Sequence, residues 1–131
     1  MQWEAGHRPA ILIADDDTAL AGVIVAALSL EASEFRHVAT REAAIDALNA
    51  QHWDLILLDT LNTRPSGDAR RFLIEACRCA AGTPVLVMTA WQEIATFASD
   101  ALPDAAVLEK PFDLDRFTRT VADLLKTPRD A

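Results

Sequence analysis

The chain has 131 residues, a length typical of one compact domain that buries its own core without disulfides or structural metals. Apolar residues make up 51% and charged residues 24%, which excludes an intrinsically disordered segment. The net charge of −8 would repel nucleic acid and anionic membrane surfaces, and no apolar run reaches the length of a membrane span, so we expect a cytoplasmic protein that binds neither directly.

Short apolar runs bounded by turn residues predict the buried strands of a parallel sheet. Three runs contain no polar residue and should form the central strands, at residues 11–14, 55–58 and 85–88. Weaker runs at residues 35–38 and 106–109 predict two outer strands.

Between these strands the apolar residues recur with the period of a helix. A first helix should follow an N-cap at Asp17 or Thr18 and end at about Leu30, with Val23 on its buried face. The others, in chain order, cover residues 42–49 after an N-cap at Thr40, 68–80, 92–100 and 114–126, where the apolar stripe of the last begins at Leu114. Five strands alternating with five helices predict a doubly wound α/β domain with a parallel sheet.

The whole chain, residues 1–131, should form this single domain, with its core at about residues 9–126. Residues 1–8 and 127–131 are predicted to be loose ends. Cys77 and Cys79 lie two apart on a predicted helix, so their side chains point in different directions and are interpreted as reduced structural thiols. The three histidines, His7, His37 and His52, are scattered, and no role is assigned to them.

Polar side chains follow four of the predicted strands, at the edge where parallel strands bind ligands. They are Asp15, Asp16 and Asp17 after the first strand, Asp59 after the third, Thr89 after the fourth and Lys110 after the fifth. Clustered carboxylates repel one another unless a cation compensates them, and oxygen donors without His or Cys favour Mg²⁺. A lysine and a hydroxyl beside the ion would stabilise a phosphoryl group in transfer, and the remaining carboxylate would be the nucleophile.

Four sequence pieces, ILIADDD, DLILLD, VMTA and EKPF, carry these residues in order. In this respect the chain, over about residues 9–126, resembles the receiver domain of bacterial two-component response regulators. The resemblance implies a flavodoxin-like fold with strand order 2-1-3-4-5. It also implies that Asp59 is the phosphoacceptor, that Thr89 and Lys110 hold the phosphoryl oxygens, and that Pro111 follows a cis peptide bond.

The same resemblance implies a Mg²⁺ site. Asp16 and Asp59 would bind the ion directly, Asp15 would bind it through water, and the backbone carbonyl of Leu61 would be a further ligand. Asp17 lies one place beyond the acidic pair of the family, so we interpret it as a helix cap.

The function implied by the resemblance is phosphoryl transfer to Asp59 from a histidine kinase or a histidine phosphotransfer protein. No enzymatic activity is expected beyond self-phosphorylation and autodephosphorylation. The phosphorylated domain would signal to an unknown output protein through changed protein–protein contacts. A homodimer would form through the face made by the helix at 92–100, the strand at 106–109 and the helix at 114–126.

Three departures from the family pattern favour an alternative, a protein-interaction module that signals without phosphorylation. The segment 60–67 lacks the usual motifs, Val107 replaces the usual aromatic residue, and Pro103 shortens the fourth helix. Trp91 either packs at the rim of the site or limits access of water to it. An aspartate-based phosphatase is disfavoured because Leu61 stands where a second carboxylate is needed, and no phosphate loop indicates a flavin site.

Overall fold

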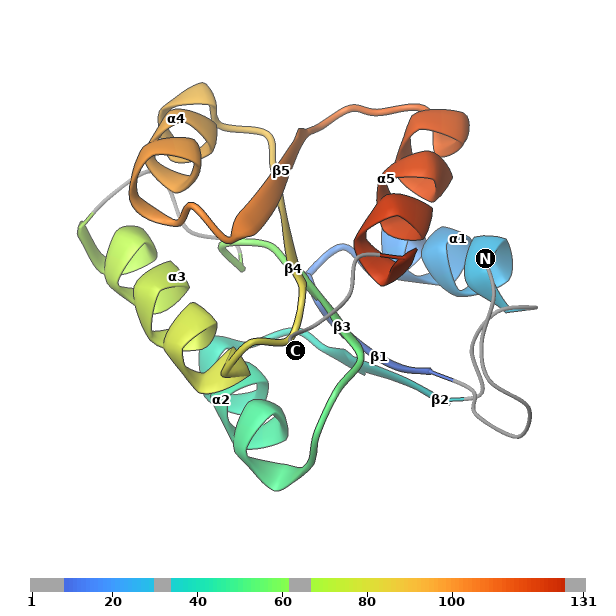
Figure 1. Ribbon diagram of the computed structural model, residues 1–131, viewed down its shortest axis with the longest axis horizontal. Helices are drawn as coiled ribbons and strands as arrows, with labels where there is room; N and C mark the ends of the chain where they lie inside the picture. The colour runs from blue at the N-terminus through green and yellow to red at the C-terminus, as the bar shows by residue number, and fades with distance from the viewer. Residues whose placement is uncertain (1–8, 30–33, 62–66, 127–131) are drawn as a thin grey trace.

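The structure, a computed structural model, describes residues 9–29, 34–61 and 67–126. Five parallel strands form one sheet in the order β2-β1-β3-β4-β5, which confirms the predicted topology (Figure 1). In chain order the strands are β1 (Ala10–Ala14), β2 (Glu34–Val38), β3 (Leu55–Leu58), β4 (Val85–Thr89) and β5 (Ala105–Glu109). The helices between them are α1 (Thr18–Leu28), α2 (Arg41–Ala50), α3 (Gly67–Ala80), α4 (Gln92–Ala101) and α5 (Leu114–Lys126).

The helices cover both faces of the sheet. In Figure 1, α1 and α5 lie on one side, and α2, α3 and α4 lie on the other. Each face has its own apolar core, because successive strand residues point to opposite faces. Along β3, for example, Ile56 and Leu58 pack with α2, α3 and α4, whereas Leu55 and Leu57 pack with α1 and α5. This two-sided burial explains why the central strands are continuous apolar runs.

For two residues the prediction of burial was wrong. Val23 in α1 is 45% exposed, and Leu114 at the start of α5 is 44% exposed. The α1 sequence contains no charged residue at all, so its apolar pattern could not indicate which face is buried. Ala21, Ile24 and Leu28 are the residues of α1 that enter the core.

Helix boundaries agree with the predicted caps. The Asp17 carboxylate accepts a hydrogen bond from the Leu20 amide at 2.9 Å, and Thr40 Oγ1 accepts one from the Ala43 amide at 3.1 Å. The first helix ends at Leu28, before the predicted end at about Leu30, a residue that lies outside the described part of the chain.

The predicted loose ends, residues 1–8 and 127–131, also lie outside the described residues, as does most of the altered segment at 62–66. Among the helices that the structure describes, none combines the length and the apolar character needed to cross a membrane. Cys77 and Cys79 are both free, and burial raises the pKa of the Cys77 thiol, which disfavours the reactive thiolate.

Candidate functional site

Strand pairing brings the polar residues together at the carboxyl edge of the sheet. Ala14 of β1 pairs with Leu58 of β3, so Asp15 and Asp59 follow neighbouring positions, and the Asp59 amide donates to the Ala14 carbonyl at 2.8 Å. The Lys110 amide donates to the Thr89 carbonyl at 2.7 Å across β4 and β5. Residues far apart in the chain therefore converge at this edge.

Three carboxylates form a cluster at this edge. Oxygen atoms of Asp15, Asp16 and Asp59 all lie within 4.8 Å of one another. Asp15 is fully buried and Asp59 is 7% exposed, whereas Asp16 is exposed. Packing three negative groups this closely is unfavourable without positive charge between them. The predicted acidic cluster is thus present.

Lys110 supplies part of that charge. Its Nζ lies 2.7 Å from Asp15 Oδ2 and 3.5 Å from Asp59 Oδ1. Burial alone would lower the pKa of Lys110, but the hydrogen bond to Asp15 and the charges of Asp59 and Asp15 outweigh burial and raise it. The lysine is therefore held as an ammonium against the carboxylates. Among the described residues it is the one cation found at the cluster, and a single positive charge does not balance three carboxylates.

The pKa of Asp59 is raised above its ordinary value of 3.8, first by burial and second by the charge of Asp15. Lys110 and the backbone amides of Leu61 and Thr60 oppose the increase without cancelling it. The Leu61 amide donates to Asp59 Oδ2 at 2.9 Å. Leu61 itself has a φ of 62°, a left-handed conformation that is strained for a residue with a side chain.

Thr89 lies fully buried at the end of β4. Its Oγ1 accepts a hydrogen bond from the Trp91 amide at 3.0 Å. Trp91 itself is 42% exposed. Val107, which stands where the family has an aromatic residue, is partly buried against the core on the side of α2, α3 and α4.

The residues of the cluster fit a hard divalent cation. Their ligand atoms are carboxylate oxygens, with no His or Cys among them, and the described part of the chain holds this one group of three such residues. Mg²⁺ prefers oxygen ligands and keeps several waters, which the exposed position of Asp16 allows. Asp15, Asp16 and Asp59 are the side chains that could hold the ion.

One contact beside the acidic cluster was not predicted from the sequence. His37 Nε2 lies 2.6 Å from the backbone carbonyl oxygen of Asp15. The contact arises because Ile13 in β1 pairs with His37 in β2, and the Asp15 amide donates to the Val38 carbonyl at 3.0 Å. The register between two strands is not visible as a motif, so the sequence carried no signal for this contact.

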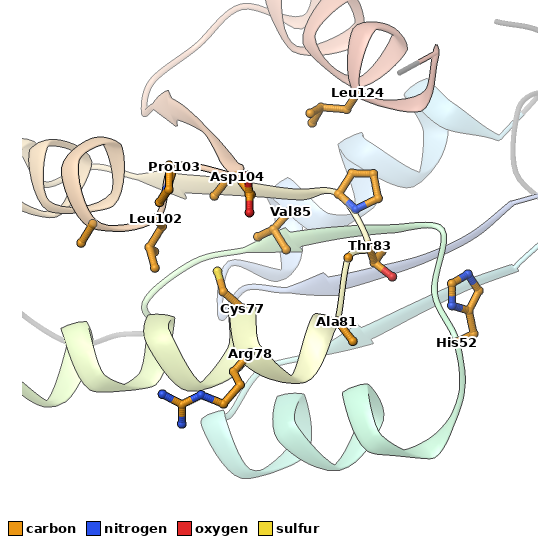
Figure 2. A pocket seen from close by; sticks show the side chains of 14 residues that line it. His52, Cys77, Arg78, Ala81, Thr83, Val85, Leu102, Pro103, Asp104 and Leu124 are labelled. Atoms are coloured by element: carbon orange, nitrogen blue, oxygen red, sulfur yellow. The ribbon is translucent and has the colours of Figure 1, made fainter. Parts of the chain in front are cut away.

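The opposite edge of the sheet differs in character. A cavity of about 890 Å³ opens there between the segments that precede β4 and β5 (Figure 2). Figure 2 shows Val85, Leu102 and Pro103 around it, with Cys77 and Asp104 nearby. None of the clustered carboxylates lines this cavity, so the predicted acidic cluster is separate from it.

Comparison with known proteins agrees with the family resemblance seen in the sequence. The family model of the response regulator receiver domain matches residues 11–122. A curated relative, the response regulator protein PmrA of Pseudomonas aeruginosa, is 36% identical over 118 residues, which is 88% of this chain and 52% of the relative. The chain therefore spans about half the length of this relative.

Solved structures agree with that match. The receiver domain of NtrX from Brucella abortus is 27% identical, with a TM-score of 0.73 over 90% of this chain and 99% of the other. A receiver domain protein described as CheY-like, from Methanospirillum hungatei JF-1, has a TM-score of 0.76 over 92% and 95% of the two chains. Its identity is 24%, so it supports the fold alone.

Proposed function

Because this chain belongs to the response regulator receiver domain family, we propose that it accepts a phosphoryl group on Asp59 in a Mg²⁺-dependent reaction. The donor would be the phosphohistidine of a histidine kinase or of a histidine phosphotransfer protein. One observation carries the proposal: Lys110 reaches both Asp15 and Asp59 inside a cluster of three carboxylates. The candidate nucleophile, Asp59, is thus flanked by two further carboxylates and by the ammonium of Lys110.

Asp59 would act as the nucleophile. A carboxylate oxygen would form a bond to phosphorus while the phosphorus–nitrogen bond of the donor breaks and the imidazole leaves with its electron pair. Mg²⁺, when bound, would neutralise phosphoryl oxygens and favour the ionised form of a carboxylate whose pKa is otherwise raised. The Leu61 amide, which donates to Asp59 Oδ2, would hold the carboxylate in one orientation.

Lys110 and Thr89 would stabilise the transferred group. The Lys110 ammonium already faces the Asp59 carboxylate at 3.5 Å, so a phosphoryl attached there would meet a positive charge without rearrangement of the chain. The Thr89 oxygen accepts from the Trp91 amide, which leaves the hydroxyl proton to be donated to a phosphoryl oxygen.

Output would come from changed contacts with another protein. We assign this output to the face formed by α4, β5 and α5, and a second copy of the chain could bind there to form a homodimer. The reaction would take place in the cytoplasm. Val107 favours a second candidate function, an interaction module of the same fold that signals without phosphorylation. The two candidates differ in Mg²⁺ affinity, because only the phosphoacceptor needs the ion.

Intact-protein mass spectrometry tests the proposal. The protein is incubated with acetyl phosphate and Mg²⁺, and we expect the mass of one added phosphoryl group, which EDTA prevents. Asp59→Asn should not gain it, whereas Asp54→Asn, which changes an equally buried aspartate outside the cluster, should gain it as the wild type does. Equal labelling of Asp59→Asn, or no labelling of the wild type, would reject Asp59 as the phosphoacceptor.

A further inference from the structure

His37 lies at the carboxyl end of β2, beside the loop that carries the acidic pair. Its Nε2 is 2.6 Å from the Asp15 carbonyl oxygen. A carbonyl oxygen can only accept, so Nε2 carries a proton and donates it. A neutral imidazole with its proton on Nε2 is sufficient for this bond, so the contact needs no positive charge on the ring.

Every polar group of Asp15 is engaged. The amide donates to the Val38 carbonyl, Oδ1 accepts from the Asp17 amide at 2.9 Å, and Oδ2 contacts Lys110 Nζ. The remaining group is the carbonyl that His37 holds. Without the imidazole, this carbonyl would be the one polar group of Asp15 that no contact within the described residues orients.

That carbonyl belongs to the peptide unit that joins Asp15 to Asp16. A peptide unit is planar, so the direction of the carbonyl also sets the direction in which the chain enters Asp16. The Asp16 carboxylate is exposed, and no hydrogen bond to it is found in the described part of the chain. Its place in the cluster therefore depends on its backbone.

We propose that His37 is a positioning residue for the cation site. By orienting the Asp15–Asp16 peptide unit, it keeps the Asp16 carboxylate within reach of Asp59. The proposal rests on the Mg²⁺ site of the proposed function, and it assigns a role to a residue of the edge strand that contributes no ligand. Removing a group that hydrogen-bonds to a metal ligand, without itself binding the metal, typically weakens metal affinity by about 10-fold to 100-fold. Because His37 acts through the backbone, we expect about 3-fold to 10-fold.

The test is Mg²⁺ binding, measured by isothermal titration calorimetry without any phosphodonor. His37→Val suits an edge strand but has no donor, so its dissociation constant should rise by about 3-fold to 10-fold. His37→Gln places an amide N–H near the position of Nε2 and should stay within about 2-fold of the wild type. His52→Val, at the opposite edge of the sheet, is the matched control and should bind as the wild type does.

A further readout and a second variant separate positioning from general damage. At saturating Mg²⁺, the rate of labelling by acetyl phosphate should differ between His37→Val and the wild type by less than about 2-fold, because the ion restores the arrangement. If His37→Val does not fold, His37→Asn replaces it, since its shorter amide stops short of the carbonyl.

The wild type and the His37 variants together distinguish failure of the positioning role from failure of the proposed function. If the wild type binds Mg²⁺ but His37→Val binds it equally well, or His37→Gln binds it as poorly as His37→Val, the positioning role is wrong and the proposed function stands. If the wild type binds no Mg²⁺, both proposals fail. The positioning role is supported if the wild type and His37→Gln both bind Mg²⁺ more tightly than His37→Val.

Discussion

Two aspartates flank β3, and they are almost equally buried. Asp54 precedes the strand and is 6% exposed, and Asp59 follows it and is 7% exposed. Their surroundings differ. Asp54 Oδ2 accepts from the Ala10 amide at 2.8 Å, and its other oxygen lies 3.7 Å from the His52 ring. Asp59 lies instead in a cluster with two further carboxylates.

Burial of an acidic group therefore does not by itself indicate chemistry. Asp54 joins the beginnings of β1 and β3, and next to it Thr83 Oγ1 donates to the Trp53 carbonyl at 3.0 Å. Asp54 and Thr83 each form a hydrogen bond with a backbone group, and these two bonds tie the amino edge of the fold together. At the carboxyl edge, three carboxylates face the single ammonium found among the described residues. The excess negative charge would attract a cation, which in turn would help to bind a phosphoryl group. Four predictions separate the two edges.

The largest effect concerns Lys110. Lys110→Gln removes the ammonium that contacts Asp15 and Asp59, and the rate of labelling by acetyl phosphate should fall by about 100-fold, as when a fixed donor to a developing charge is lost. Mg²⁺ affinity should not fall, because the cluster loses a competing positive charge. Arg119→Gln, an exposed change on α5, is the control for charge. A parallel loss of Mg²⁺ affinity would mean that Lys110 supports the fold of the site instead.

The second prediction concerns stabilisation by the ion. Mg²⁺ at 100 times its dissociation constant should raise the free energy of unfolding of the wild type by about 2.7 kcal/mol, since the ion binds the folded chain. Asp54→Asn should gain the same amount, and Asp59→Asn should gain clearly less. Urea unfolding with and without Mg²⁺ measures both. If Mg²⁺ raised the free energy of unfolding equally in the two variants, Asp59 would not be a ligand of the ion.

The third prediction concerns the amino edge. Asp54→Ala leaves the Ala10 amide without its carboxylate acceptor, and the free energy of unfolding should fall by about 1–3 kcal/mol. The Mg²⁺ dissociation constant should not change, because Asp54 is outside the cluster. Thermal unfolding and calorimetry on the same variant check the two parts. Loss of Mg²⁺ affinity in a folded Asp54→Ala protein would show that the edges are coupled.

The smallest effect is a pH dependence of stability. Because the folded chain raises the pKa of Asp59, ionisation of this residue costs stability as the pH rises through that pKa. Asp59→Asn resembles the protonated form at all pH values. In EDTA it should therefore be more stable than the wild type near pH 7, and the difference should shrink as the pH falls toward about 4. Urea unfolding over this range measures it, and a difference that is constant with pH would contradict the raised pKa.

Much of the fold could be predicted because the physical signals are local. Residues 55–58 are apolar throughout, since helices cover both faces of the central strand. The edge strand β2 gave a weaker signal because Glu34, Arg36 and His37 are exposed along it. Val23 was misplaced because every residue around it in α1 is uncharged, and only packing against the sheet decides which of them is buried.

The candidate site was predictable where its residues follow strands. Asp15, Asp59 and Lys110 each stand at a strand end, and parallel pairing brings such ends together. The contact between His37 and Asp15 depends on strand register, and the role of Asp54 depends on pairing with the start of β1. Neither is marked by a residue pattern, so both required the structure.

The most direct test of the cation site uses Mn²⁺, which takes the same oxygen ligands as Mg²⁺ and broadens the NMR signals of nearby amides. In a heteronuclear spectrum with substoichiometric Mn²⁺, we expect the amide signals of Asp16 and Asp59 to disappear first, while those of Asp54 and Thr83 persist. Broadening centred on Asp54, or spread evenly over the chain, would contradict the claim that the carboxyl edge of the sheet is a single cation site.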